Sequence, residues 1–167
     1  MIRPATDPFG RSGGYINGSG GISRGVELGV EARPTRSLTL NGSYTYTNAV
    51  NDRDIQVAGF WRALTVPKHT ATLVATQRIG RRADVTVDLY RASSHYISFF
   101  AVNRSRPFVL PGYTKADIVG GYRIWSRDSA TLKGYVKIEN FFNKPYYENG
   151  WRSARAWAIA GLSYSFQ

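Results

Sequence analysis

The chain has 167 residues, of which 43% are hydrophobic and 14% aromatic, and its formal net charge is +11. It contains no cysteine, which excludes disulfides and thiolate metal sites, and its two histidines cannot form a metal site alone. The positive charge is spread through turns, loops and alternate positions without a known nucleic-acid motif, so no nucleic-acid partner is expected.

Residues 1–21 are rich in Gly, Pro and Ser and predict a loop, with a short strand near Tyr15. The first thirty residues contain no apolar segment of the kind that a secretory signal peptide has. No later stretch approaches the run of about eighteen apolar residues that predicts a transmembrane helix.

Strict alternation of apolar and polar residues begins at residue 22. In the first such segment Val26, Leu28 and Val30 fall on one face, whereas Glu27 and Glu31 fall on the other. This period of two predicts β-strands, because a helix needs apolar residues spaced by three and four. Seven such strands are expected, over residues 22–32, 37–49, 66–79, 83–96, 112–124, 131–142 and 152–167.

The connections between these strands alternate in length. Short turns are expected at 33–37, at Gly80 and Arg81, and at 125–129, and long connections at 50–65, 97–110 and 143–151. Pro145 cannot donate to a ladder, so the strand before it is expected to stop about there. Strands of soluble proteins average about five or six residues, and those that cross a membrane need about nine to eleven. The pattern favours an all-β fold, an antiparallel transmembrane β-barrel segment with short periplasmic turns and long external loops.

Aromatic residues fall where the two membrane interfaces are expected. Tyr44 and Tyr46 lie toward a long-loop end, and Tyr122, Tyr164 and Phe166 lie toward the short-turn end. A soluble antiparallel barrel or sandwich remains an alternative, in which the apolar face is core and the charged face is surface. Alternation alone does not separate the two.

The stretch VKIENFFNKPYYENG (136–150) resembles the penultimate strand and last external loop of TonB-dependent outer-membrane receptors, in its residues Asn140, Phe141, Phe142, Asn143, Lys144 and Tyr146. SRGVELGVEARP, LTLNGSYTYTNA, VPKHTATL and LPGYTKADIVGGYRI resemble earlier strands of the same barrel, in the same order. The resemblance covers residues 22–167. It implies that this segment is the C-terminal portion of such a barrel.

The end of the chain resembles the signal by which the barrel assembly machinery recognises its clients. Gly161, Tyr164 and Phe166 match that signal. Two residues depart from it: Ile159 stands where a polar residue is usual, and Gln167 follows the phenylalanine.

The resemblance implies active uptake of a scarce nutrient, most often a ferric siderophore, across the outer membrane of a Gram-negative bacterium. The implied partners are outer-membrane lipid, lipopolysaccharide, the barrel assembly machinery and the siderophore; no cofactor is expected. TonB would act only through an N-terminal plug region, which this chain does not resemble. The chain is therefore expected to be a fragment that does not transport alone. The alternative is a stand-alone small barrel in which residues 1–21 supply an eighth strand.

Ligand contacts are expected in the external loops. Arginine offers a planar fork for anionic chelates, and aromatic faces suit flat ligands. The candidates are Trp61, Arg62, Arg104, Arg106, Tyr147, Trp151 and Arg152. The alternative is that these loops contact lipopolysaccharide and each other. The charges Glu27, Glu31, Lys133, Lys137 and Glu139 are expected to pair across strands or to meet the plug.

An enzyme would need a nucleophile and base, or paired carboxylates, at the rim. Asp52 and Asp54 share one loop, and His95 lies near Ser93, Ser94 and Ser98. Such proximity in sequence is common by chance, so no catalytic activity is expected.

Overall fold

The computed structural model describes residues 2–6, 12–17, 21–51, 66–101, 104–127, 129–148 and 151–166. Within these ranges all regular elements are β-strands, which confirms the all-β prediction. None of the described residues belongs to a helix long and apolar enough to cross a membrane.

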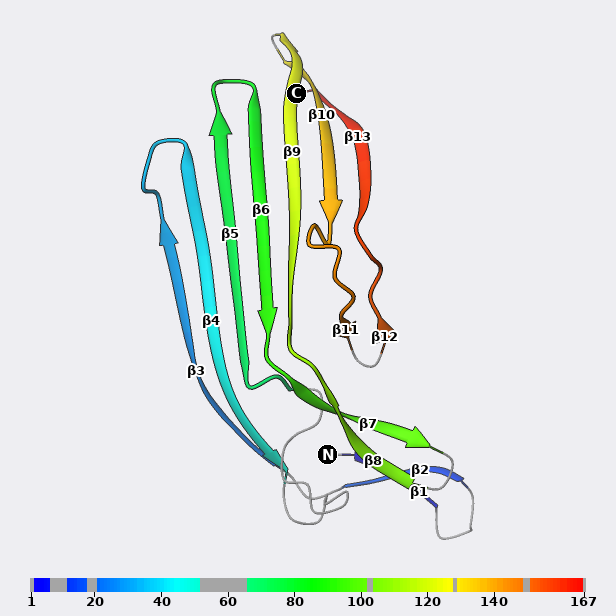
Figure 1. The fold of residues 1–167 in the computed structure, drawn as a ribbon. Helices are drawn as coiled ribbons and strands as arrows, with labels where there is room; N and C mark the ends of the chain where they lie inside the picture. Colours follow the sequence, from blue (N-terminus) through cyan, green and yellow to red (C-terminus); the bar gives the residue numbers. More distant parts are fainter. Residues whose placement is uncertain are drawn as a thin grey trace.

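Seven long strands form one antiparallel sheet, in the order β13-β10-β9-β6-β5-β4-β3 (Figure 1). Each long strand lies beside the long strand that precedes it in the sequence, and the strands are 10 to 15 residues long. The sheet is open, with β3 and β13 at its edges. Its strands are β3 (Gly21–Ala32), β4 (Leu38–Asn51), β5 (His69–Ile79), β6 (Ala83–Ala92), β9 (Tyr113–Arg127), β10 (Ala130–Glu139) and β13 (Trp157–Phe166).

Three further hairpins were not predicted as such. They are β1 (Ile2–Thr6) with β2 (Ser12–Asn17), β7 (His95–Ala101) with β8 (Arg104–Leu110), and β11 (Tyr147–Glu148) with β12 (Trp151–Arg152). The last two lie largely within connections expected to be long loops, although His95, Tyr96 and Arg152 fall in segments expected to be strands. The strands β1 and β2 pair with each other and not with a described edge of the large sheet, so here they supply no eighth strand.

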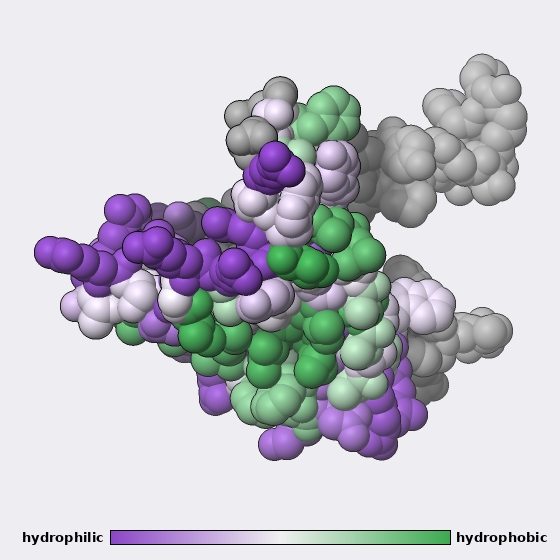
Figure 2. Space-filling model, turned by 90° about the horizontal axis from the view of Figure 1, so that it is seen from above, coloured by the Kyte–Doolittle hydropathy of each residue, from purple (hydrophilic) through white to green (hydrophobic). Residues whose placement is uncertain are grey.

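The register places the predicted apolar residues on one continuous face. Val87 of β6 lies opposite Ile118 of β9, which lies opposite Ile138 of β10, and Ala158 of β13 follows. This face is exposed: Leu28 retains 59% of its accessible surface. Figure 2, which looks onto the short-turn end, shows hydrophobic residues gathered in one continuous patch.

A hydrophobic core is nearly absent from the part of the chain that the structure describes. Only four apolar residues there are buried, and these are Ala92, Ile97, Leu110 and Ala116. A soluble sandwich would cover its apolar face with a second layer, because that burial supplies most of its stability. An exposed apolar face backed by a polar one is the arrangement of a barrel wall in lipid.

The short turns lie at one end of the sheet and the longer connections at the other (Figure 1). Gly80 has a φ of 59°, a left-handed conformation that explains the glycine in the β5–β6 turn. Several boundaries differ from the prediction: among them, β6 ends at Ala92 instead of residue 96, and β13 begins at Trp157 instead of residue 152. The strand β9 continues into the expected turn as far as Arg127, because Trp125 pairs with Leu132 beyond a β-bulge.

The strand β10 ends at Glu139, well before the proline that was expected to stop it. Asn140 leaves the ladder with a φ of 51°, and the following N–H of Phe141 is donated to the carbonyl of Ala116. The side chain of asparagine tolerates this left-handed conformation, so Asn140 ends the strand and Pro145 does not.

Candidate functional site

The candidate ligand residues within the described ranges all lie at the long-connection end of the sheet (Figure 1). Tyr147 pairs with Arg152 across the β11–β12 hairpin, and Trp151 lies beside them, 81% exposed. All three residues are exposed in the last loop, with Tyr147 and Arg152 on one face of the hairpin and Trp151 on the other. Arg104 and Arg106 lie in β8 of the neighbouring connection. The predicted residues Trp61 and Arg62 lie outside the described residues.

The last loop is held by Asn140, which is only 4% exposed. Its side-chain Nδ2 donates to the carbonyls of Lys144 and Ala154, each at 2.9 Å. Its backbone N–H donates to Oδ1 of Asp117 at 2.9 Å. One side chain thus ties both arms of the loop together and joins them to β9.

Asn143 supplies the second left-handed residue of the loop, with a φ of 53°. Its Oδ1 accepts the N–H of Ala156 at 3.2 Å. Farther out, Tyr146 and Ser153 exchange two hydrogen bonds, of 3.0 and 2.8 Å. The asparagines of the NFFNKPYY stretch therefore shape the loop that presents the β11–β12 hairpin.

A tyrosine cluster that the sequence reading did not assign lies at the base of this loop. The rings of Tyr113 and Tyr146 stack with centroids 4.5 Å apart, and Tyr90 lies 5.8 Å from Tyr113. The Tyr113 hydroxyl donates to Oε1 of Glu148 at 2.8 Å. Burial raises the pKa of Tyr146, so this phenol stays neutral at physiological pH. The only sequence signal was the recurrence of tyrosine near strand ends.

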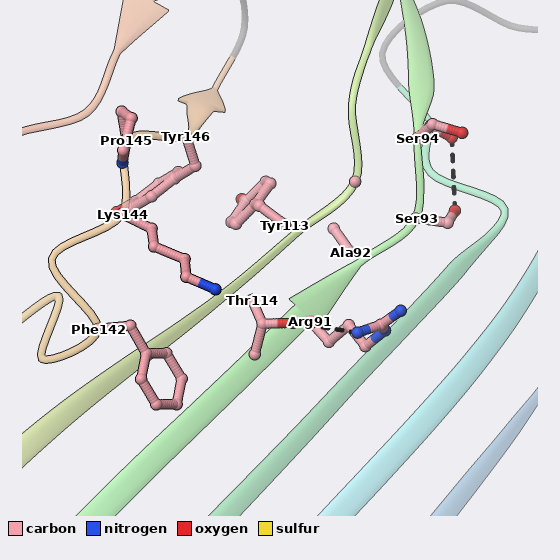
Figure 3. A pocket seen from close by; sticks show the side chains of 11 residues that line it. Arg91, Ala92, Ser93, Ser94, Tyr113, Thr114, Phe142, Lys144, Pro145 and Tyr146 are labelled. Carbon is pink, nitrogen blue, oxygen red and sulfur yellow. Dashed lines mark hydrogen bonds between the residues drawn. The ribbon is translucent and has the colours of Figure 1, made fainter.

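A pocket of about 640 Å³ opens at this rim, between the ends of β6 and β9 and the last loop. Figure 3 shows Lys144 and Arg91 on either side of Thr114, with Phe142 beside them. Nη1 of Arg91 donates to Oγ1 of Thr114 at 3.2 Å. The lining thus combines two cations, a hydroxyl and an aromatic ring.

The polar face carries the predicted charges, but they pair in two different ways. Lys133 of β10 reaches across β9 to Oδ1 of Asp84 on β6, at 2.7 Å, as expected for pairing across strands. Lys137 instead bonds to Glu139 on its own strand, because residues two apart in a strand share a face. Glu31 likewise pairs with Arg33, two residues on, at 3.0 Å.

The three residues of the expected assembly signal fall on two faces. Tyr164 and Phe166 lie on the apolar face near the short turns, and their rings are 6.2 Å apart. Gly161 lies on the polar face, opposite Tyr135. A Cβ added to Gly161 would lie 2.6 Å from both Cζ and Oη of Tyr135. The glycine therefore makes room for a tyrosine ring that crosses over it.

Nothing in the described ranges assembles a metal centre, since no group of three or more potential metal-ligating side chains comes together there. His95 is 6% exposed, and its Nδ1 has no hydrogen-bond partner among the described residues. Asp52 and Asp54 lie outside the described residues.

Comparison with known proteins decides the family. Residues 2–140 match the family model described as TonB dependent receptor-like, beta-barrel. The chain belongs to the TonB-dependent receptor family. Members of this family are transport receptors and not enzymes, which agrees with the expectation from the sequence.

Two curated receptors are similar in sequence. The metal-pseudopaline receptor CntO of Pseudomonas aeruginosa is 29% identical over 139 residues, covering 83% of this chain and 19% of that protein. The ferrioxamine B receptor of Salmonella typhimurium is 28% identical over 143 residues, covering 84% and 19%. The chain thus spans about a fifth of the length of the curated relatives it matches.

Solved receptor structures share the fold. The pyoverdine outer membrane receptor FpvA of Pseudomonas aeruginosa superposes with a TM-score of 0.72 at 16% identity, covering 97% of this chain and 23% of that one. The ferric-catecholate import receptor Fiu of E. coli gives 0.69 at 20% identity, covering 98% and 23%. At these identities the likeness establishes the architecture, and this TonB-dependent receptor chain has the wall of such a barrel.

Proposed function

We propose that this chain is the C-terminal part of the barrel wall of an outer-membrane receptor that takes up a ferric siderophore. Its similarity to receptors for metal-pseudopaline and ferrioxamine B supports the ligand class. Residues 22–167 would form the wall, further strands would close the barrel, and a plug elsewhere in the receptor would engage TonB. The coverage of about a fifth of each relative supports this division.

The observation that carries the proposal is the exposed group of Tyr147, Trp151 and Arg152 at the long-connection end. It stands on a loop fixed by the buried Asn140, so its geometry is set before a ligand arrives. The guanidinium of Arg152 and the ring of Tyr147, paired across the hairpin, suit an anionic chelate with flat groups. Arg104, Arg106, Trp61 and Arg62 are proposed to contribute from the other two loops.

The test uses a strain that lacks the receptor, complemented with variants of the intact receptor containing this chain. Uptake of iron-loaded ferrioxamine B and of a ferric catecholate is measured under iron limitation. Arg152→Gln should weaken uptake of the cognate chelate by about tenfold, the scale of one lost charge-assisted hydrogen bond. Arg81→Gln, which removes the same charge from the opposite short turn, should leave uptake unchanged.

Equal uptake by parent and Arg152→Gln would remove this arginine from the ligand site. The probes also include iron-loaded pseudopaline and pyoverdine, the ligands named for two similar receptors. Uptake of none of these chelates by the parent receptor, when it is present in the outer membrane, would contradict the siderophore assignment. Localisation is checked by membrane fractionation. The barrel assembly machinery and lipopolysaccharide complete the proposed partners.

A further inference from the structure

The charges of the large sheet are segregated by face. Every described acidic residue of its seven strands lies at a register position of the polar face; these residues are Glu27, Glu31, Asp84, Asp88, Asp117 and Glu139. The apolar face carries cations instead. Arg24 lies there on β3 and Arg91 on β6, both toward the long connections.

Arg91 lies just beyond the edge of the apolar belt. Leu89 pairs with Ala116 in the last apolar row across β6 and β9, and Arg91 pairs with Thr114 in the next row outward. Two residues along a strand span about 7 Å. When the apolar rows of the sheet lie in the hydrocarbon of the membrane, a cation one row farther out lies level with the lipid head groups and not with the acyl chains.

The last loop brings a second cation to the same place. The carbonyl of Lys144 is held by Nδ2 of Asn140, and its side chain extends into the rim pocket toward Thr114 (Figure 3). Among the described residues, neither Arg91 nor Lys144 has an acidic partner. Phe142, 45% exposed, lies beside them in the same pocket.

We propose that the rim pocket formed by Arg91, Thr114, Phe142 and Lys144 binds a phosphate of the phosphorylated diglucosamine glycolipid of the outer leaflet, lipid A. Arg91 offers a planar fork and Lys144 a point charge to the phosphate oxygens. The Thr114 hydroxyl donates a further hydrogen bond. The Phe142 ring packs against the first segment of an acyl chain. The stretch that shapes the siderophore loop therefore also fixes the barrel in its outer leaflet.

This inference uses the membrane placement in the proposed function but not its ligand. The intact receptor containing this chain is purified in detergent, and lipid binding is measured by non-denaturing mass spectrometry. The probes are bisphosphoryl lipid A, monophosphoryl lipid A and phosphatidylglycerol. Folding of each variant is confirmed by its heat-modifiable mobility on gels.

Arg91→Gln and Lys144→Gln should each weaken binding of bisphosphoryl lipid A about fivefold, and together about 25-fold, as expected for head-group cations. Arg81→Gln, at the opposite membrane face, should bind like the parent. Monophosphoryl lipid A should bind more weakly than the bisphosphoryl form. Because Arg91 faces away from the lumen, siderophore uptake should be unchanged in Arg91→Gln, which separates this site from the ligand site.

Three results would overturn the proposal. The double variant could bind bisphosphoryl lipid A as tightly as the parent. Arg81→Gln could lose as much affinity as Arg91→Gln, which would mean that total charge alone matters. Phosphatidylglycerol could bind as tightly as bisphosphoryl lipid A, which would make this a general anionic-lipid surface. If Lys144→Gln does not fold, the single variant Arg91→Gln decides between the same outcomes.

Discussion

The glycine of the last strand gives the sharpest test of the packing. Gly161→Ala places a methyl group 2.6 Å from Cζ and Oη and 2.8 Å from Cε1 of Tyr135. These distances are shorter than van der Waals contact, so the tyrosine ring must leave its place over β13. Because the affected atoms are the far end of a side chain that is 39% exposed, the ring can move without distorting the backbone.

The expected destabilisation is about 1 kcal/mol, at the low end of the 1–3 kcal/mol typical of overpacking. In a Tyr135→Ala background the clash is absent, and Gly161→Ala should be neutral or slightly stabilising, because alanine is less costly than glycine in a strand. The assay is urea unfolding of the refolded receptor in detergent, followed by tryptophan fluorescence. Equal destabilisation in both backgrounds would refute the contact. It would mean that the cost arises from a structural feature of Gly161 other than its contact with Tyr135.

Three further predictions follow from the described contacts. Breaking the partly exposed ion pair between Lys133 and Asp84 by Lys133→Met should cost about 1 kcal/mol or less, and a double-mutant cycle with Asp84→Asn in urea unfolding measures it. Asn140→Asp keeps the shape of the side chain but loses its donor, and it should speed protease cleavage of residues 140–156, whereas cleavage in β9 should be unchanged. The folded loop holds the Tyr146 proton more tightly than the unfolded chain does. The loop's stability should therefore be constant below the ordinary tyrosine pKa of about 10 and fall above it, as hydrogen exchange against pH would show; Tyr146→Phe should make that fall smaller.

The sheet was predictable because its signal repeats along the chain. Period-two alternation placed all seven strands and their apolar face, and the register brings those faces together. The incorrect predictions concerned the ends of individual strands. No sequence pattern predicted that the ladder would continue through Trp125 to Arg127, because a bulge depends on the partner strand. The strand β10 ends just before the left-handed Asn140 and not near Pro145, where a proline predicts the end of a strand.

The site was only partly predictable, because its contacts join residues far apart in sequence. Trp151 and Arg152 could be chosen as exposed loop residues of suitable chemistry. The structural role of Asn140 could not, since its side-chain partners lie four and fourteen residues away and its backbone partner Asp117 lies on another strand. The pairing of Gly161 with Tyr135 is equally invisible without the register.

The apolar face of this sheet is expected to meet lipid, and the polar face is expected to meet an aqueous lumen. The chain contains no native cysteine, so single cysteines at positions 26 to 31 of β3 can each carry a nitroxide label. In the receptor reconstituted into lipid vesicles, oxygen accessibility should peak at Val26, Leu28 and Val30. Accessibility to a water-soluble nickel chelate should peak at Glu27, Gly29 and Glu31. Labels at 26, 28 and 30 that are shielded from both reagents would instead show a buried protein core and contradict the barrel-wall account.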